Sequence, residues 1–150
     1  TIRDLVDRAN GEVHGAVWAL RAGTSQGSLQ RTIADVIERA RRELRLEISF
    51  DITGDRPAAG PAEHEVPKII AEALTNASRH GHARSVRVSV TLSQTRIWVD
   101  VVDDGVVPIA PETSGGLGIV GMQERARHCG GSVLVGPNPS GRGFFVKLRI

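Results

Sequence analysis

Apolar residues recur every three or four positions in four segments of the chain, which is the spacing of an amphipathic helix. These segments are residues 1–22, 28–45, 65–80 and 118–128. In the second segment arginines occupy the outward positions, and Ser28 is a suitable N-cap. The pattern therefore predicts four helices, each of which buries one apolar face.

Other segments alternate apolar and polar residues, as half-buried strands do. They are residues 46–53, 86–92, 97–103, 132–135 and 143–150. Because these strands alternate unevenly with the helices, we expect an α/β sandwich of the α+β class, with the helices on one face of a mixed sheet.

Prolines, glycines and short polar pairs mark where the elements end. Residues 54–61 are rich in Gly and Pro and are typical of a loop. Pro67 is compatible with a helix only near its start, so the third helix is expected to begin near residues 63–66. Ser93-Gln94 is short enough for a hairpin turn between two strands.

Composition narrows the classes of function. With 40% hydrophobic and 24% charged residues, the 150-residue chain is typical of one soluble globular domain. Aromatic residues are only 3% of the chain and the formal charge is +2, which argues against a nucleic-acid partner. No run reaches the roughly 18 apolar residues of a membrane span, so no membrane contact is expected. The single cysteine, Cys129, fits a reducing cytosol, and the start at Thr1 without Met suggests a piece of a longer protein.

Glu72, Asn76 and His80 form a polar ladder along one edge of the third helix. Steps of four residues keep the three side chains on one side of the helix, beside its apolar stripe. A carboxylate, a carboxamide and an imidazole at the margin of a core are costly to desolvate unless they bind something. The alternative is an ordinary solvated helix face with a weak contact between Glu72 and Asn76.

An acidic residue ends the third predicted strand. Asp103 is followed by Asp104-Gly105, which is compatible with a simple turn. In a functional interpretation, one carboxylate points into a pocket at the sheet edge. Because a carboxylate only accepts hydrogen bonds, it can recognise the exocyclic amine of adenine and repel the carbonyl of guanine.

A glycine cluster, residues 114–122, opens directly into the fourth helix. Gly116 and Gly118 permit close backbone approach, and the helix N-terminus presents unpaired N–H groups to an anion such as a phosphate. A flexible loop with a tight helix start is the alternative. The cluster is neither a Walker A motif nor a dinucleotide fingerprint, because it lacks the Gly-Lys-Ser/Thr ending and the preceding strand.

The order of these motifs resembles the GHKL, or Bergerat-fold, ATPases, and among them the catalytic ATP-binding domain of two-component sensor histidine kinases. The branch with nitrate- and oxygen-sensing kinases is the most similar. The likeness lies in Glu72-Ala-Leu-Thr-Asn-Ala-Ser-Arg-His80, followed by His82-Ala83, and in Gly116-Leu-Gly-Ile-Val-Gly-Met-Gln-Glu-Arg125. Residues 16–21 also look like the end of the dimerisation helix of that branch. The resemblance implies a mostly antiparallel sheet, a linker over residues 1–24 and a catalytic domain over residues 25–150.

The resemblance also implies roles for individual residues. Glu72 is expected to act as the general base, and Asn76 to ligate Mg²⁺ through its amide oxygen. Asp103 is expected to hold the adenine amine, with Gly105 giving the backbone room beside the base. The remaining expected contacts are to the phosphates, and for His80 a packing role at the helix end is the alternative. These contacts come from Arg79, His80, Gly116, Leu117 and Gly118.

Three features depart from the family pattern. Val107 stands where a second Gly of the Asp-x-Gly-x-Gly motif is expected, and it precedes a proline, which confines it to extended conformations. Phe144 follows Gly143 where a Thr is usual. The phosphoacceptor motif is missing, since His14 is flanked by glycine and lacks the expected acidic neighbour.

The resemblance implies a protein histidine kinase that uses ATP and Mg²⁺ and transfers the γ-phosphoryl group to a histidine on a separate dimerisation domain. Its expected partners are ATP and ADP, that dimerisation domain and a response regulator, in a homodimeric full-length protein. A cytoplasmic location is expected, with or without a membrane anchor on the full-length protein. Two alternatives are an anti-sigma-factor-type serine kinase and a degenerate nucleotide-binding regulatory module without transfer activity.

Overall fold

The computed structural model describes residues 27–106 and 118–150. The helix predicted over residues 1–22 and the glycines before Gly118 lie outside these residues. The described elements follow one another as α2 (Leu29–Glu43), β1 (Glu47–Thr53), α3 (Pro61–Arg79), β2 (Ser85–Leu92), β3 (Ile97–Asp103), α4 (Ile119–His128), β4 (Ser132–Pro137) and β5 (Phe144–Arg149).

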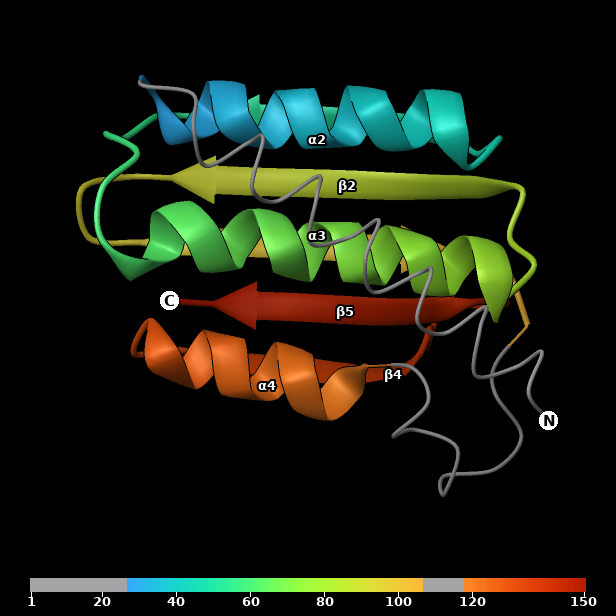
Figure 1. Ribbon diagram of the computed structural model, residues 1–150. Coiled ribbons are helices and arrows are strands. Elements are labelled where there is room, and N and C mark those ends of the chain that lie inside the picture. The colour runs from blue at the N-terminus through green and yellow to red at the C-terminus, as the bar shows by residue number, and fades with distance from the viewer. Residues whose placement is uncertain (1–26, 107–117) are drawn as a thin grey trace, which may run out of the picture.

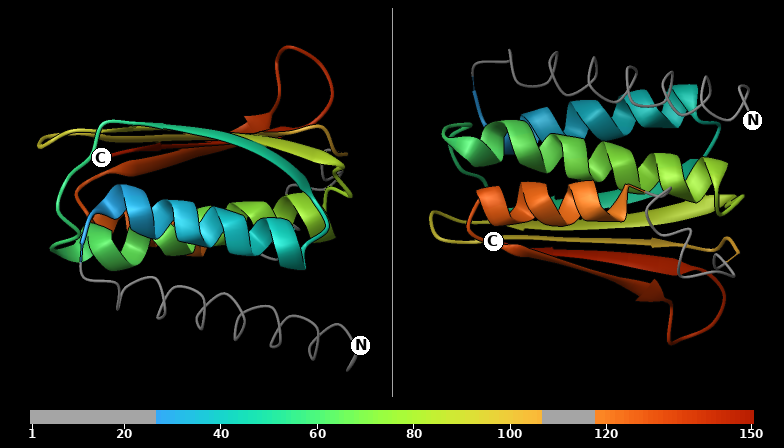
Figure 2. Two further views of the ribbon diagram at one scale, coloured as in Figure 1. Left: turned by 90° about the horizontal axis from the view of Figure 1, so that it is seen from above. Right: turned by 60° about the horizontal axis from the view of Figure 1, so that its bottom comes forward.

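The five strands form one sheet in the order β1-β2-β3-β5-β4. The pair β1 and β2 is parallel, and the other three pairs are antiparallel. Figures 1 and 2 show α2, α3 and α4 side by side on the same face of the sheet, with α3 in the middle. The predicted α/β sandwich with a mixed, mostly antiparallel sheet is therefore confirmed.

Helix α2 forms where its spacing predicts it. Ser28 has an extended backbone, and its hydroxyl oxygen accepts a hydrogen bond from the Arg31 N–H at 3.1 Å, so it is the N-cap that the sequence indicates. Arg41 and Arg42 lie in the last turn, where positive charge is favourable beside the exposed carbonyls. The apolar face packs into the core through Leu29, Ile33, Val36, Ile37 and Ala40.

The predicted start of α3 is wrong by about one turn. The helix begins at Pro61 and not near residues 63–66, because Gly60 takes a positive φ of 78° and turns the chain directly into the helix. Pro61 fits the first helical position, where the missing N–H is not needed. Pro67 consequently lies inside the helix, buried in the core, and the carbonyl of Glu63 lacks the backbone donor that residue 67 would otherwise supply.

The hairpin between β2 and β3 has a longer turn than predicted. Its connection runs from Ser93 to Arg96, and the Ser93 N–H donates to the Arg96 carbonyl at 2.9 Å. The hydroxyl oxygen of Ser93 also accepts from the N–H groups of Thr95 and Arg96. The Ser93 hydroxyl thus supplies an acceptor for two backbone N–H groups of the turn.

The alternation of β2 and β3 places one set of side chains against the helices. Val88 pairs with Val101 and Val90 pairs with Val99, and all four are buried. The opposite face bears polar and amphipathic residues, among them Trp98, which is 42% exposed. The guanidinium groups of Arg96 and Arg149 lie 5.0 and 5.2 Å from its ring, so cations cover this aromatic surface on the face that the helices leave open.

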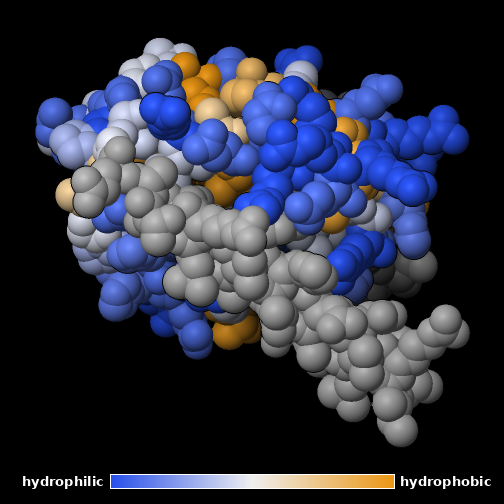
Figure 3. Space-filling model, turned by 45° about the horizontal axis from the view of Figure 1, so that its top comes forward, coloured by the Kyte–Doolittle hydropathy of each residue, from blue (hydrophilic) through white to orange (hydrophobic). Residues whose placement is uncertain are grey.

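The described surface over the helices is mainly hydrophilic. On the side shown in Figure 3, hydrophobic residues reach the surface only in small, separate places. Among the described residues, every helix is too short or too polar to serve as a membrane span.

The buried face of α3 leads to a first prediction. Leu74 is fully buried in the middle of that helix, so Leu74→Ala is expected to lower the free energy of unfolding by about 2–5 kcal/mol, because it leaves a cavity in the core. Leu134 on β4 is 63% exposed and serves as the control, since Leu134→Ala should change stability by less than about 0.5 kcal/mol. Urea unfolding followed by circular dichroism measures both, and equal losses would contradict the assignment of the core.

Candidate nucleotide site

The polar ladder of α3 runs from the middle of the helix to its C-terminal end. Asn76 is buried, at 7% exposure, and Glu72 is half-buried one turn before it. His80 and Arg79 are exposed, and His80 is the C-cap of the helix. The helix thus holds the carboxamide and the carboxylate at the margin of the core, and it presents the imidazole and the guanidinium to the outside.

The start of α4 lies against Glu72. Gly118 caps α4 in the left-handed conformation, with a φ of 68°. A Cβ atom built on Gly118 would come within 2.4 Å of the Glu72 Oε1 atom, so a larger residue here would displace the Glu72 side chain. The predicted base and the predicted phosphate-binding helix end are therefore adjacent, and glycine is required at residue 118 for both its φ and its close approach.

Asp103 is the last residue of β3 and is 7% exposed. It lies at the end of the sheet where α3 ends and α4 begins (Figure 1). Its Oδ1 atom accepts hydrogen bonds from the N–H of Gly105 at 2.8 Å and from the N–H of Phe144 at 3.2 Å. Burial raises the pKa of the Asp103 carboxyl above its usual range, the two backbone donors oppose this rise, and the neighbouring Asp104 charge adds to it. The fold therefore keeps a carboxylate in a place where its charge is costly.

The two carboxylate oxygens of Asp103 differ in their hydrogen bonds. Within residues 27–106 and 118–150, both hydrogen bonds to this side chain go to Oδ1. No fully buried side-chain oxygen in that part of the chain lacks a partner, so Oδ2, which takes neither of these two bonds, is not completely buried. An oriented acceptor of this kind is suited to an amino group on a ligand.

Two close backbone approaches shape the surroundings of Asp103. A Cβ atom on Gly105 would lie 2.3 Å from the carbonyl oxygen of Gly81, which follows the end of α3. A Cβ atom on Gly143, whose φ is 110°, would lie 1.7 Å from the carbonyl oxygen of Asp103. Gly105 therefore makes room first for the chain itself, since it lets the turn after β3 pack on the residues after α3.

Sequence reasoning missed Gly81 and Gly143. Gly81 follows His80 directly, and Gly143 was considered only as the first residue of the last predicted strand, before Phe144, and not as a neighbour of Asp103. A signal was present in the position of Gly143 immediately before a strand that pairs with β3. The contact with Asp103, however, depends on two segments that are 40 residues apart in the chain.

Phe144 keeps one interaction that does not depend on its side chain. The bond that it donates to Asp103 comes from its backbone N–H, which every residue except proline can supply. The side chain is half-buried and packs against the core. The departure from the usual Thr therefore leaves this contact to Asp103 intact.

Several predicted positions lie outside the described residues. Gly116 and Leu117 are among them, as are Val107 and His14. Of the predicted site residues, the structure brings together Glu72 with Gly118, and Asp103 with Gly105, at one end of the sandwich. In Figure 1 this end is on the right, where α3 and β3 finish and α4 begins.

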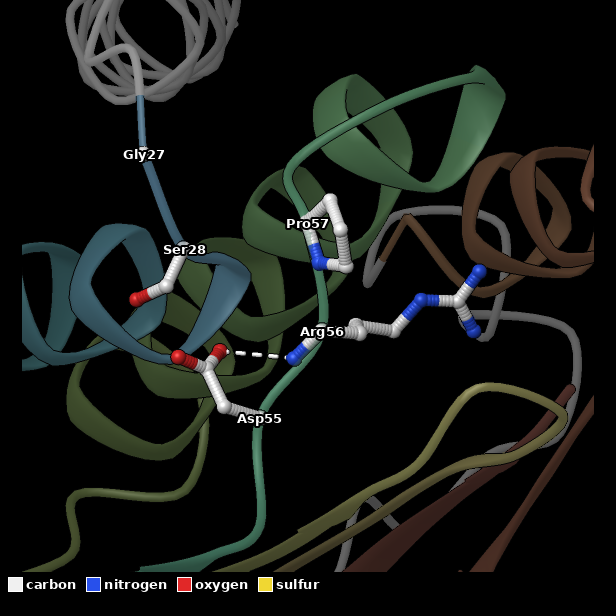
Figure 4. A pocket seen from close by; sticks show the side chains of 5 residues that line it. All are labelled: Gly27, Ser28, Asp55, Arg56 and Pro57. Atoms are coloured by element: carbon white, nitrogen blue, oxygen red, sulfur yellow. Dashed lines mark hydrogen bonds between the residues drawn. The ribbon is translucent and has the colours of Figure 1, made fainter.

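A hollow in the surface lies at the opposite end. It has a volume of about 420 Å³, is open to solvent, and is lined by Gly27, Ser28, Asp55, Arg56 and Pro57. In Figure 4, the Asp55 carboxylate points toward the start of α2 and accepts a hydrogen bond from the Arg56 N–H. It also accepts from the Gln30 N–H at 3.1 Å, so this polar group caps a helix and belongs to no group of catalytic residues. The hollow is therefore not the predicted site.

The residues present fit a magnesium ion only as part of a complex with phosphates. Among the described residues, no three His, Cys, Asp or Glu side chains gather at one place to hold a metal. Asn76 supplies a carboxamide oxygen, a hard ligand that Mg²⁺ accepts, and the ion usually keeps several waters and substrate phosphates around one or two protein ligands. One buried carboxamide, one helical turn from the carboxylate of Glu72, matches that mode of binding.

Comparisons with known proteins agree with this geometry, although no family model matches the chain. The sensor histidine kinase YhcY of Bacillus subtilis is 28% identical over 152 aligned residues, which cover 99% of this chain and 38% of that protein. The sensor histidine kinase LiaS of the same organism is 24% identical, with 99% of this chain and 41% of that protein covered. The chain thus spans about two fifths of the length of these curated relatives.

A solved structure supports the same fold. The ATP-binding domain of PrrB from Mycobacterium tuberculosis has a TM-score of 0.57 and 25% identity, and the match covers 77% of this chain and 90% of that one. The chain therefore has the fold of histidine kinase ATP-binding domains, and its similarity to sensor histidine kinases along nearly its whole length supports an ATP-binding kinase role.

Proposed function

We propose that this chain is the catalytic domain that binds Mg-ATP in a sensor histidine kinase and delivers the γ-phosphoryl group to a histidine on a separate helical domain. One observation carries the proposal. The half-buried Glu72 lies against Gly118 at the N-terminus of α4, while the buried Asp103, at the same end of the sheet, has one oxygen that takes neither of its two backbone hydrogen bonds. The N-terminus of α4 beside Glu72 suits the phosphates of a nucleotide. The carboxylate of Asp103, elsewhere at the same end of the sheet, suits its base.

Each end of the nucleotide has its own residues. Asp103 accepts a hydrogen bond from the exocyclic amine of adenine through Oδ2, because Oδ1 is occupied by the two backbone donors. Asn76 holds the magnesium ion, which neutralises the phosphates and orients them. Arg79 and His80 at the exposed end of α3, with Gly116, Leu117 and Gly118, contact the phosphates.

Transfer of the phosphoryl group depends mainly on positioning and electrostatics. A nitrogen of the acceptor imidazole attacks the γ-phosphorus in line, the bond from that phosphorus to the bridging oxygen breaks, and ADP leaves. Glu72 accepts the proton that the imidazole loses. Its half-buried position beside the α4 N-terminus keeps the carboxylate oriented toward this end of the site.

The remaining context is also proposed. The motif Glu72-Ala-Leu-Thr-Asn-Ala-Ser-Arg-His80 supports a place in the branch with nitrate- and oxygen-sensing kinases. Residues 1–24 end the dimerisation helix, and residues 25–150 form the catalytic domain. The full-length protein acts in the cytoplasm as a homodimer, and its phosphorylated histidine passes the group to an aspartate of a response regulator.

Transfer to a separate acceptor tests the function directly. The chain is incubated with γ-phosphate-labelled ATP, Mg²⁺ and a histidine-bearing dimerisation domain, and acid-labile label on that domain is the expected result. Glu72→Gln should lower the transfer rate by about 10²- to 10⁴-fold while it retains ATP binding. Glu63→Gln, in the first turn of the same helix, is the control and should transfer normally. ATP binding without any label on histidine would refute the kinase and favour the regulatory nucleotide-binding module.

Asp103→Asn should change how the stability of the chain depends on pH. The pKa of this acid is raised in the folded protein, so its charge lowers stability as the pH rises through that pKa. The Asn variant, which still accepts the two backbone hydrogen bonds, should be more stable than the original chain at pH 7, and the difference should vanish below the usual pKa of 3.8. Urea titrations at several pH values measure this difference.

The same variant should bind ATP at least about tenfold more weakly and should lose its preference for ATP over GTP, because a carboxamide can also donate to the guanine carbonyl. Calorimetric titrations with ATP, GTP and ADP give the affinities. Unchanged selectivity would remove Asp103 from the adenine site.

Asn76→Asp should change how ATP binding depends on magnesium. An added negative charge beside the phosphates should weaken binding about tenfold or more without Mg²⁺, and the loss should shrink as Mg²⁺ is added. Gln94→Glu adds the same charge in the turn at the opposite end of the sheet and should leave the magnesium dependence as it is. ATP affinity is measured against Mg²⁺ concentration for the original chain and both variants. The same magnesium dependence in all three proteins would contradict the role of Asn76.

A further inference from the structure

Asp104 ties the end of β3 to the segment that connects α3 with β2. Its Oδ1 atom accepts hydrogen bonds from the N–H groups of Arg84 at 2.9 Å and Ser85 at 3.1 Å. Its Oδ2 atom accepts from the Ser85 hydroxyl at 3.0 Å. The Asp104 N–H donates in return to the Ser85 carbonyl at 3.2 Å. Asp104 thus takes part in four hydrogen bonds with this segment, three through its carboxylate and one through its backbone N–H.

Two neighbouring contacts join the same two segments. The Val106 N–H donates to the carbonyl of Gly81 at 2.7 Å, and the Cα of Gly105 packs against that carbonyl. Gly81 is in turn connected to α3, since its N–H donates to the Asn76 carbonyl at 2.9 Å. A continuous set of contacts therefore runs from Asn76, through Gly81, to the turn that follows Asp103.

Asp104 lies in the same turn as the residue that holds the Asp103 side chain. The Oδ1 atom of Asp103 is held by the N–H of Gly105, two residues along, so its geometry depends on the turn that Asp104 occupies. Hydrogen bonds with Ser85 and Arg84 lower the pKa of Asp104 despite some desolvation, so this carboxylate stays charged at neutral pH and remains an acceptor for all its donors. Its donors among the described residues are Arg84, Ser85 and its own backbone N–H.

We propose that Asp104 is a positioning residue of the nucleotide site, which clamps the turn after β3 onto the segment after α3 and so sets the adenine-binding carboxylate of Asp103 relative to Asn76. The inference rests on the proposed function for its effect on nucleotide. Asp104 is exposed and need not touch the nucleotide itself. Its side chain acts through the turn that contains Gly105.

The chain provides a matched control in Asp55. That carboxylate is also exposed and also accepts two backbone hydrogen bonds, from Gln30 at 3.1 Å and Arg56 at 2.7 Å, but it lies at the opposite end of the sandwich. Asp55→Ala therefore removes a comparable set of interactions without any path to Asp103. A general loss of stability would affect both variants alike.

The first measurement needs no nucleotide. Backbone amide spectra of the nucleotide-free chain report the hydrogen bonds that Gly105 and Phe144 donate to Asp103. Asp104→Ala is expected to shift both amide resonances and to speed their hydrogen exchange, while Asp104→Asn, which retains an acceptor oxygen, and Asp55→Ala leave them near their original values. Unaltered Gly105 and Phe144 resonances in Asp104→Ala would overturn the inference and leave the proposed function standing.

The second measurement compares a ligand that has adenine and phosphates with a ligand that has phosphates alone. Asp104→Ala is expected to weaken ATP binding about tenfold and to leave the binding of inorganic tripolyphosphate unchanged, because the latter does not use Asp103. Asp104→Asn should restore most of the ATP affinity, and Asp55→Ala should not change it. Equal weakening of both ligands would overturn the positioning role. If the original chain bound no ATP, the proposed function would fail, and with it the effect of Asp104 on adenine.

Discussion

The burial of α3 between α2, α4 and the sheet is the constraint on which the rest of the structure depends. Its apolar stripe packs on all three neighbours, and this packing fixes the rotation of the helix. Once that rotation is fixed, Glu72 and Asn76 have to lie at the margin of the core and not in solvent. The same packing brings the N-terminus of α4 against Glu72, because Gly118 leaves no side chain between them.

The second organising feature is a buried charge that is held by backbone groups. Asp103 is stabilised by donors from its own turn and from the start of β5, and Asp104 connects that turn to the segment after α3. Buried carboxylates are costly unless they are hydrogen-bonded, and the two described hydrogen bonds to Asp103 go to only one of its two oxygens. Perturbed carboxylates of this kind are enriched at functional sites, which is consistent with the role proposed for Asp103.

Helix and strand positions were predictable because each depends on short-range periodicity. The cap at Ser28 and the alternating valines of β2 follow from local rules, and the structure confirms both. The start of α3 was not predicted correctly. Pro67 suggested a start near residues 63–66, but the positive φ of Gly60 turns the chain into the helix at Pro61. The turn at Ser93–Arg96 was likewise longer than its polar pair suggested.

The sequence by itself determined which polar side chains are candidates for the site, because a carboxylate and a carboxamide beside an apolar stripe, and an acidic residue at a strand end, are visible in the order of residues. Only the tertiary structure decided how these groups are held. The contacts of Gly105 with Gly81, of Gly143 with Asp103 and of Asp104 with Ser85 join segments that are distant in the chain. Their only local trace is a glycine or an aspartate, and those residues are common in any turn.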